Sequence, residues 1–227
     1  MKTIISLISL VALGSLGVCQ DAKPVTKPTQ KAGQTSKYTM KLALDVNGSP
    51  GELTTTSQIT VKSVKADLIE VETNWTGTKL VVDGSENELP TFEPFTVVSK
   101  PTGQIVKASG GFEQLSAFSL MILEQFFAPA TPVEKGVTSK MKFDKTGDIP
   151  ALEIEVTNQG PEKVGERSAT KYTQKLKAIS DIGMALEGTF WIGEDGTILK
   201  VEQKVTNLPV TSNGQTGSGT FKLEIKA

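Results

Sequence analysis

The stretch YTMKLALDV at residues 38–46 alternates apolar side chains with small or polar ones. A β-strand with one buried face requires this period of two, because successive side chains point to opposite sides of the strand. The preceding residues, 20–36, contain no large apolar side chain beyond Val25 and are rich in Lys, Pro, Thr and Gln. We therefore predict a single β-rich domain that begins at residue 37 and continues to residue 227.

The same alternation returns at five further places along the chain. Its apolar members are Ile59 and Val61; Ile69, Val71 and Trp75; Leu152, Ile154 and Val156; Tyr172, Leu176 and Ala178; and Phe221, Leu223 and Ile225. Turn signals separate these runs, among them NGSPG at 47–51, DGSENELP at 83–90 and GEDG at 193–196. Strands that are apolar on one side and charged on the other predict an antiparallel sheet of about nine to eleven strands with a single buried face.

The stretch GGFEQLSAFSLMILEQFFAP at residues 110–129 breaks the alternation. Its apolar side chains recur at helical spacing, which predicts one helix over about 112–127, and Pro129 ends it. The segment is apolar almost all round, so we expect it to be buried. A helix of about 24 Å cannot cover so many strands if they form a flat sheet. We therefore expect a mainly β (α+β) fold in which a curved antiparallel sheet, an incomplete β-barrel, wraps around this helix.

A sheet curled around one helix leaves room for an apolar cavity between them. Its candidate lining residues are Phe112, Leu115, Phe118, Ile122, Phe126 and Trp75. Two functions follow from this arrangement. In the first, the protein binds a hydrophobic small molecule or lipid between sheet and helix. In the second, the barrel is fully packed and the protein is a structural or interaction module that contacts another protein of the cell envelope.

The first 19 residues predict an export signal. Lys2 precedes an apolar run from Ile4 to Val18, which is too short to span a membrane. We expect an exported protein, periplasmic or secreted, with a disordered tether over 20–36 and no transmembrane span in the mature chain. Cys19, the single cysteine, has two interpretations: it is a lipid attachment point, or it is the last residue that an ordinary signal peptidase removes.

Two residue types are nearly or wholly missing from the sequence. The chain has no histidine, and Cys19 lies in the predicted leader. These facts exclude histidine-dependent catalytic triads and the usual zinc, copper and non-haem iron sites. The net charge of −1, with Arg167 as the single arginine, does not favour nucleic acid as a partner. We therefore predict a protein that is not an enzyme and needs no metal or cofactor.

Several short motifs match catalytic or binding signatures by letter but not by context. SATK at 168–171 and KTG at 145–147 resemble β-lactamase motifs, yet SATK begins an alternating strand and follows KTG. DKTGDIPALEIE at 144–155 has Ile149 where a calcium loop needs glycine. The acid pairs Glu70 with Glu72 and Glu153 with Glu155 share strand faces, and we interpret them as solvated surface.

The stretch GTFWIGEDGTILKVEQKV at 188–205 combines an aromatic strand, a Gly/Asp turn and an amphipathic strand that contains lysines. It resembles the corresponding hairpin of exported bacterial half-barrel domains, the LolA and LolB lipoprotein carriers and the LppX and LprG lipid-binding lipoproteins. The resemblance implies a curved antiparallel sheet of about eleven strands closed by helices over a lipid cavity. Those carriers have several covering helices and an arginine-dependent cavity, whereas this chain has one predicted helix and one arginine, so no functional residue is carried over.

Overall fold

The structure, a computed structural model, describes residues 31–226 apart from 47, 66, 102, 113–114, 130, 181–182, 195–196 and 213–214. The predicted signal peptide, Cys19 and most of the predicted tether lie outside the described residues. The first strand begins at Thr35, two positions before the predicted start of the domain.

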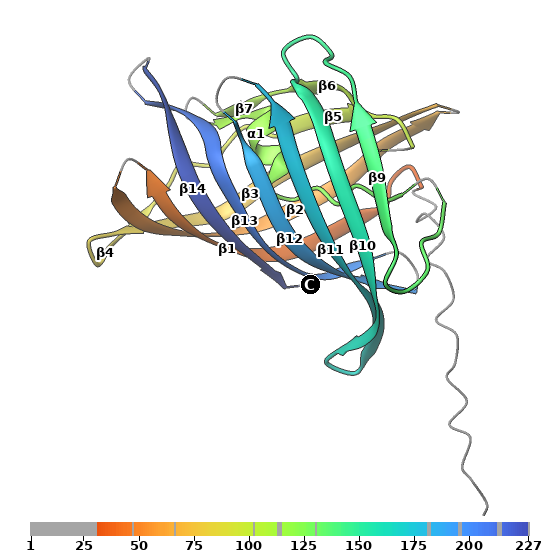
Figure 1. The fold of residues 1–227 in the computed structure, drawn as a ribbon. Coiled ribbons are helices and arrows are strands. Elements are labelled where there is room, and N and C mark those ends of the chain that lie inside the picture. Colours follow the sequence, from red (N-terminus) through yellow and green to blue (C-terminus); the bar gives the residue numbers. More distant parts are fainter. Residues whose placement is uncertain are drawn as a thin grey trace, which may run out of the picture.

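The fold is a curved antiparallel sheet of twelve strands that is not closed into a barrel, which confirms the predicted fold class (Figure 1). Its spatial order is β6-β5-β3-β2-β1-β14-β13-β12-β11-β10-β9, and β4 pairs with β3. The strands are β1 (Thr35–Val46), β2 (Ser49–Lys65), β3 (Leu68–Val82), β4 (Ser85–Glu88), β5 (Phe95–Ser99), β6 (Ile105–Ser109), β9 (Thr138–Phe143), β10 (Ala151–Val164), β11 (Arg167–Ile179), β12 (Ala185–Gly193), β13 (Ile198–Ser212) and β14 (Gln215–Lys226).

The chain runs outward from the middle of the sheet in two arms. β1 pairs with β14, so the first and last strands are neighbours, and successive hairpins lead to the edge strands β6 and β9. The turn signals in the sequence mark these hairpins. Asp83 and Gly84, both with positive φ, join β3 to β4 as a two-residue turn whose twist matches that of the strands. Register shifts between β2 and β3 and between β10 and β11 mark β-bulges, which bend a sheet.

The segment that joins the two edge strands crosses the concave face of the sheet. It begins with a small hairpin, β7 (Gly111–Phe112) with β8 (Leu115–Ser116), and continues into α1 (Ala117–Ile122). It ends in a stretch without helix or strand, residues 123–129 and 131–137, which we call the strap. In Figure 1 the strands β9–β14 form the front layer, β1–β3 pass behind them, and α1 lies between the two layers.

The helix is shorter than the predicted range of 112–127, because both of its ends are taken by other interactions. Phe112 pairs with Leu115 in the small hairpin, and the Ser116 hydroxyl then caps α1 by accepting a hydrogen bond from the Ser119 N–H (3.2 Å). At the other end, carbonyl groups of the strap accept hydrogen bonds from glutamine side chains of the sheet. The backbone is therefore satisfied without another helical turn.

The two faces of the sheet differ as the alternation predicts. The concave face carries the core, in which Met40, Ile154, Leu176, Phe190 and Val201 are at most 1 % exposed. The convex face carries cross-strand ion pairs, including those of Glu153 with Lys142, Glu155 with Lys140 and Glu72 with Lys62. The interpretation of these glutamates as solvated surface therefore agrees with their positions, and solvent screens such exposed pairs.

Within the described residues, no helix has both the length and the apolar character needed to cross a membrane.

Candidate functional site

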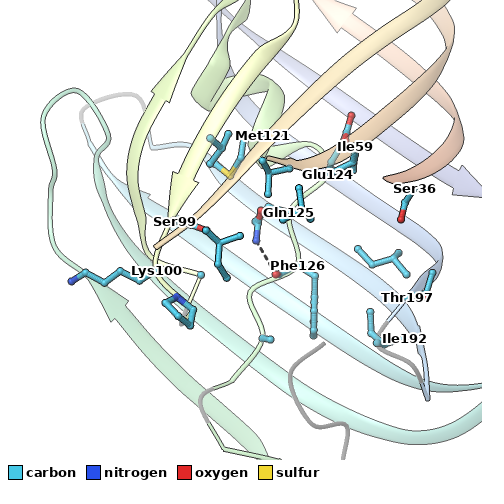
Figure 2. A pocket seen from close by; sticks show the side chains of 18 of the residues that line it. Ser36, Ile59, Ser99, Lys100, Met121, Glu124, Gln125, Phe126, Ile192 and Thr197 are labelled. Carbon is cyan, nitrogen blue, oxygen red and sulfur yellow. Dashed lines mark hydrogen bonds between the residues drawn. The ribbon is translucent and has the colours of Figure 1, made fainter. Parts of the chain in front are cut away.

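An apolar cavity of about 470 Å³ lies between the concave face of the sheet and the strap (Figure 2). Strands β2, β3 and β5 form one wall, the strap and the end of α1 cover it, and side chains of β11, β12 and β13 stand opposite. The apolar lining includes Ile59, Val61, Val71, Val97, Phe126 and Ile192. This volume falls within the range of about 300–1,000 Å³ that is usual for small-molecule sites.

The cavity lining reaches one rim of the sheet, where β2 and β5 end and β3 begins, and we call this end of the cavity its mouth. Lys65 pairs with Leu68, and Ile69 pairs with Ser99, so these residues share one edge. Lys65 and Lys100 are exposed there. Figure 2 shows the Lys100 side chain directed away from the cavity. The mouth is therefore polar and basic at its border, whereas the interior is mainly apolar.

The inner end of the cavity contains a buried carboxyl group, that of Glu124 in the strap. Its Oε1 accepts a hydrogen bond from the Trp75 indole N–H (2.8 Å), and the Ser57 hydroxyl lies 3.1 Å from both of its oxygens. Ser57 and Trp75 are directly opposite each other on β2 and β3, and both point to the concave face. Glu124 is 9 % exposed, and among the described lining residues it is the one carboxylate.

Burial governs the protonation of this carboxyl group. Loss of solvent raises the pKa of Glu124 from its ordinary 4.5 to about 7, while the hydrogen bonds from Trp75 and Ser57 act in the opposite direction. At neutral pH the neutral and ionised forms are therefore both populated. A carboxyl group in an apolar cavity with such a pKa is sensitive to what occupies the cavity.

Three buried amide side chains of the sheet hold the strap in place. Gln174 of β11 donates to the Gln125 carbonyl (3.1 Å) and accepts from the Phe127 N–H (2.8 Å). Gln203 of β13 donates to the Leu123 carbonyl. Further along, Asn158 of β10 donates to the carbonyl of residue 133 (2.7 Å). These three carbonyl groups and one N–H group of the strap therefore have hydrogen-bond partners inside a mainly apolar interior.

The six residues predicted to line a cavity lie at different places. Phe126 lines the cavity, where its ring packs 5.4 Å from that of Tyr172 and 5.0 Å from that of Phe190. Trp75 stands behind Glu124 and packs edge-on against Phe95, which is part of the lining.

The remaining four lie in or before α1. Ile122 is wholly buried in the core, and Phe118 packs against the core. Phe112 and Leu115 pair in the small hairpin. The structure does not describe their side chains.

The polar residues of the site were missed from the sequence, although a signal for them exists. Gln174 lies in the inward register of Tyr172 and Leu176, and Gln203 in that of Val201 and Val205. A polar residue at an inward position of an otherwise apolar strand face needs a buried partner. Glu124 lies within the segment predicted to be a buried helix, and no role was predicted for it from the sequence.

Residues outside the cavity show structural roles. Trp191 lies on the convex face, where its N–H donates to Glu162 (3.0 Å) and the ammonium groups of Lys171 and Lys200 lie 5.2 and 4.5 Å from its ring centre. SATK at 168–171 is part of β11, a strand rather than the start of a helix. In the part of the chain that the structure describes, no three acidic, cysteine or histidine side chains gather as a metal site requires.

No protein-family profile matches the chain, and no curated protein matches it. Among solved structures, it is similar to a protein from Bacteroides fragilis that is described as exported and of YmcC-like fold, with 14% identity and a TM-score of 0.30 over 86% of this chain and 98% of that one. It is also similar to a DUF1329 family protein from Desulfovibrio piger, with 10% identity and a TM-score of 0.23 over 86% of this chain and 84% of that one. At such scores neither likeness assigns a function to this chain.

Proposed function

We propose that the protein is an exported, non-catalytic binding protein that holds one single-chain lipid in the cavity between the sheet and the strap. The observation that carries the proposal is the cavity itself, whose walls are mainly apolar and whose lining reaches the exposed Lys65 and Lys100 at the rim. Export rests on the predicted leader. The alternative, a fully packed interaction module, requires a filled interior, and a cavity of about 470 Å³ does not favour it.

The shape and charge of the cavity fit one chain with its head group at the rim. Along β2 the lining extends from Ile59 to Lys65, about 20 Å at 3.3 Å per residue. The walls between these ends are apolar, so a hydrocarbon chain lying along them gains about 25 cal/mol for each Å² that it buries. The rim carries Lys65 and Lys100 and no carboxylate among its described lining residues, which suits a neutral or anionic head group.

The contacts of Glu124 favour binding over catalysis. Its donors, Trp75 and Ser57, are themselves buried in the sheet and are 2 % and 0 % exposed. Ser57 has a carboxyl group as its neighbour, but the described cavity lining offers no separate base to activate it as a nucleophile. We therefore assign this trio to the shape and polarity of the cavity.

A matched pair of substitutions on β5 tests the proposal. Val97 lines the cavity, whereas its neighbour Val98 points to the opposite face of the sheet. We expect the purified protein to take up the apolar fluorescent probe N-phenyl-1-naphthylamine at one saturable site. Val97→Phe fills part of the cavity and should weaken uptake at least about tenfold, which corresponds to about 1.4 kcal/mol.

Val98→Phe makes the same change on the convex face and should bind the probe as the wild type does. Circular dichroism of both variants checks that the fold is retained. A wild-type protein without saturable uptake, or an equal loss of uptake in the two variants, would refute the proposal.

A further inference from the structure

The inner end of the cavity places an ionisable group where a hydrocarbon chain would end. The lining of β3 runs inward from Ile69 to Thr73, and the next inward-facing residue, Trp75, donates to Glu124. Lys65, at the mouth, lies eight residues along β2 from Ser57, about 26 Å at 3.3 Å per residue. The negative charge of an ionised Glu124 is therefore far from the basic rim.

Several titratable or polar groups face this carboxyl from the elements around it. β2 contributes Ser57, β3 contributes Trp75, and β1 contributes Tyr38, which pairs with Ser57 in the sheet. Tyr172 of β11 lines the same cavity. The cations of the lining, Lys65 and Lys100, belong to the mouth, so none of the described lining residues places a positive charge beside Glu124.

The neutral form of Glu124 keeps both partners if the Ser57 hydroxyl hydrogen turns away from the carboxyl group. A proton on Oε2 can be donated to the Ser57 oxygen, which lies 3.1 Å away, while Oε1 continues to accept from the Trp75 N–H. The ionised form keeps the hydrogen bonds from Trp75 and Ser57, but no cation of the described lining lies beside it, and the side chain is still 9 % exposed. A hydrocarbon chain in the cavity removes this remaining exposure, and complete burial costs a carboxylate without a neighbouring cation far more than a neutral hydrogen-bonded carboxyl group.

We propose that the cavity takes up its hydrocarbon chain together with one proton on Glu124, so that binding strengthens as the pH falls and the ligand is released as the pH rises. This inference rests on the proposed function, because it concerns the same cavity. It also restricts the ligand: the end that reaches Glu124 is hydrocarbon, and a charged head group stays at the rim.

The linkage between binding and protonation fixes the size of the effect. The pKa of Glu124 in the empty protein is about 7, and a bound chain raises it further by removing solvent. The association constant should then be nearly constant below about pH 6 and fall about tenfold between about pH 6 and pH 8. Near pH 8, binding should take up about one proton for each chain bound.

The experiment measures binding of N-phenyl-1-naphthylamine, a probe that stays uncharged in this range, to three forms of the purified protein. The wild type should lose about tenfold in affinity between about pH 6 and pH 8. Glu124→Gln keeps an acceptor for Trp75 and a donor for Ser57 but does not titrate, so its affinity should not change with pH. Glu134→Gln, at an exposed position of the same strap, should behave as the wild type does.

A second measurement needs no variant. Titration calorimetry of the wild type in two buffers with different ionisation enthalpies reports the protons taken up on binding, and about one is expected near pH 8. Binding that is tight but independent of pH, or that strengthens as the pH rises, would overturn the inference and leave the proposed function intact. The same pH dependence in Glu124→Gln would also overturn it. Absence of uptake at every pH would refute both proposals.

Discussion

Because Glu124 is buried, we predict that Glu124→Gln makes the empty protein more stable than the wild type at neutral and alkaline pH. At acidic pH this gain should disappear. The side chain is 9 % exposed and lies among apolar groups of the strap and sheet. Glutamine has the same shape, can accept from the Trp75 N–H and can donate to the Ser57 oxygen. The substitution therefore removes the ionisation and preserves the contacts.

The magnitude follows from the change in pKa on folding. The pKa of Glu124 rises from 4.5, its value in the unfolded chain, to about 7 in the folded protein, so folding takes up a proton between these pH values. Each pKa unit corresponds to about 1.4 kcal/mol, and the whole shift to about 3 kcal/mol. This contribution is fully present below pH 4.5 and is lost as the pH rises through 7. We compare the two proteins by subtracting the free energy of unfolding of the wild type from that of Glu124→Gln. This difference should be about 3 kcal/mol larger at pH 8 than at pH 4.

Urea unfolding of both proteins at several pH values between these limits measures the difference. Comparing the two proteins at each pH cancels the titration of other groups, such as Glu153 and Glu155, whose pKa values are lowered by hydrogen bonds from Lys142 and Lys140. The exposed substitution Glu134→Gln serves as the control and should show no such trend. A difference between Glu124→Gln and wild type that stays constant with pH would refute the inference that burial raises the pKa of Glu124.

Three further changes test the strap, the sheet and the leader. Gln174→Leu leaves two buried backbone groups of the strap without partners and should lower the free energy of unfolding by about 2–4 kcal/mol in urea titrations, whereas Thr173→Val on the opposite face should have little effect. Gly188→Ala places a Cβ 2.8 Å from the Cβ of a neighbouring glutamine, and thermal unfolding should show a loss of about 1–3 kcal/mol. At the leader, intact-mass analysis of the exported protein should give an unmodified chain that starts at Gln20, and Cys19→Ser should leave its solubility unchanged. A lipid-modified mass starting at Cys19 would instead show an anchored protein.

The strands were predictable from the sequence because their burial is one-sided. Alternation such as that of Tyr38, Met40 and Leu42 reports directly which face packs inward, and turn residues such as Asp83 and Gly84 mark where one strand ends and the next begins. Both signals are local, so they remain readable in a single sequence.

The crossing segment was less predictable because tertiary contacts decide its conformation. Helical spacing over 112–127 is real, yet Phe112 pairs in a hairpin and the chain leaves the helix after Ile122. The side chains that satisfy the strap come from residues as distant as Gln203, and no local pattern reports such a partner. The polar end of the cavity was missed for the same reason, since Glu124 reaches its partners only when the strap lies across the sheet.

The most direct test of the proposed chain-binding cavity uses the two tryptophans, which lie on opposite faces of the sheet. Trp191→Phe leaves Trp75, at the inner end of the cavity, as the single tryptophan. Titration with a long-chain alcohol that carries bromine at the end of its chain should quench the fluorescence of Trp75 at one saturable site, and the same alcohol without bromine should not. Adding Val97→Phe should weaken the quenching. If the brominated chain binds but leaves the fluorescence of Trp75 unchanged, the hydrocarbon chain does not lie in this cavity.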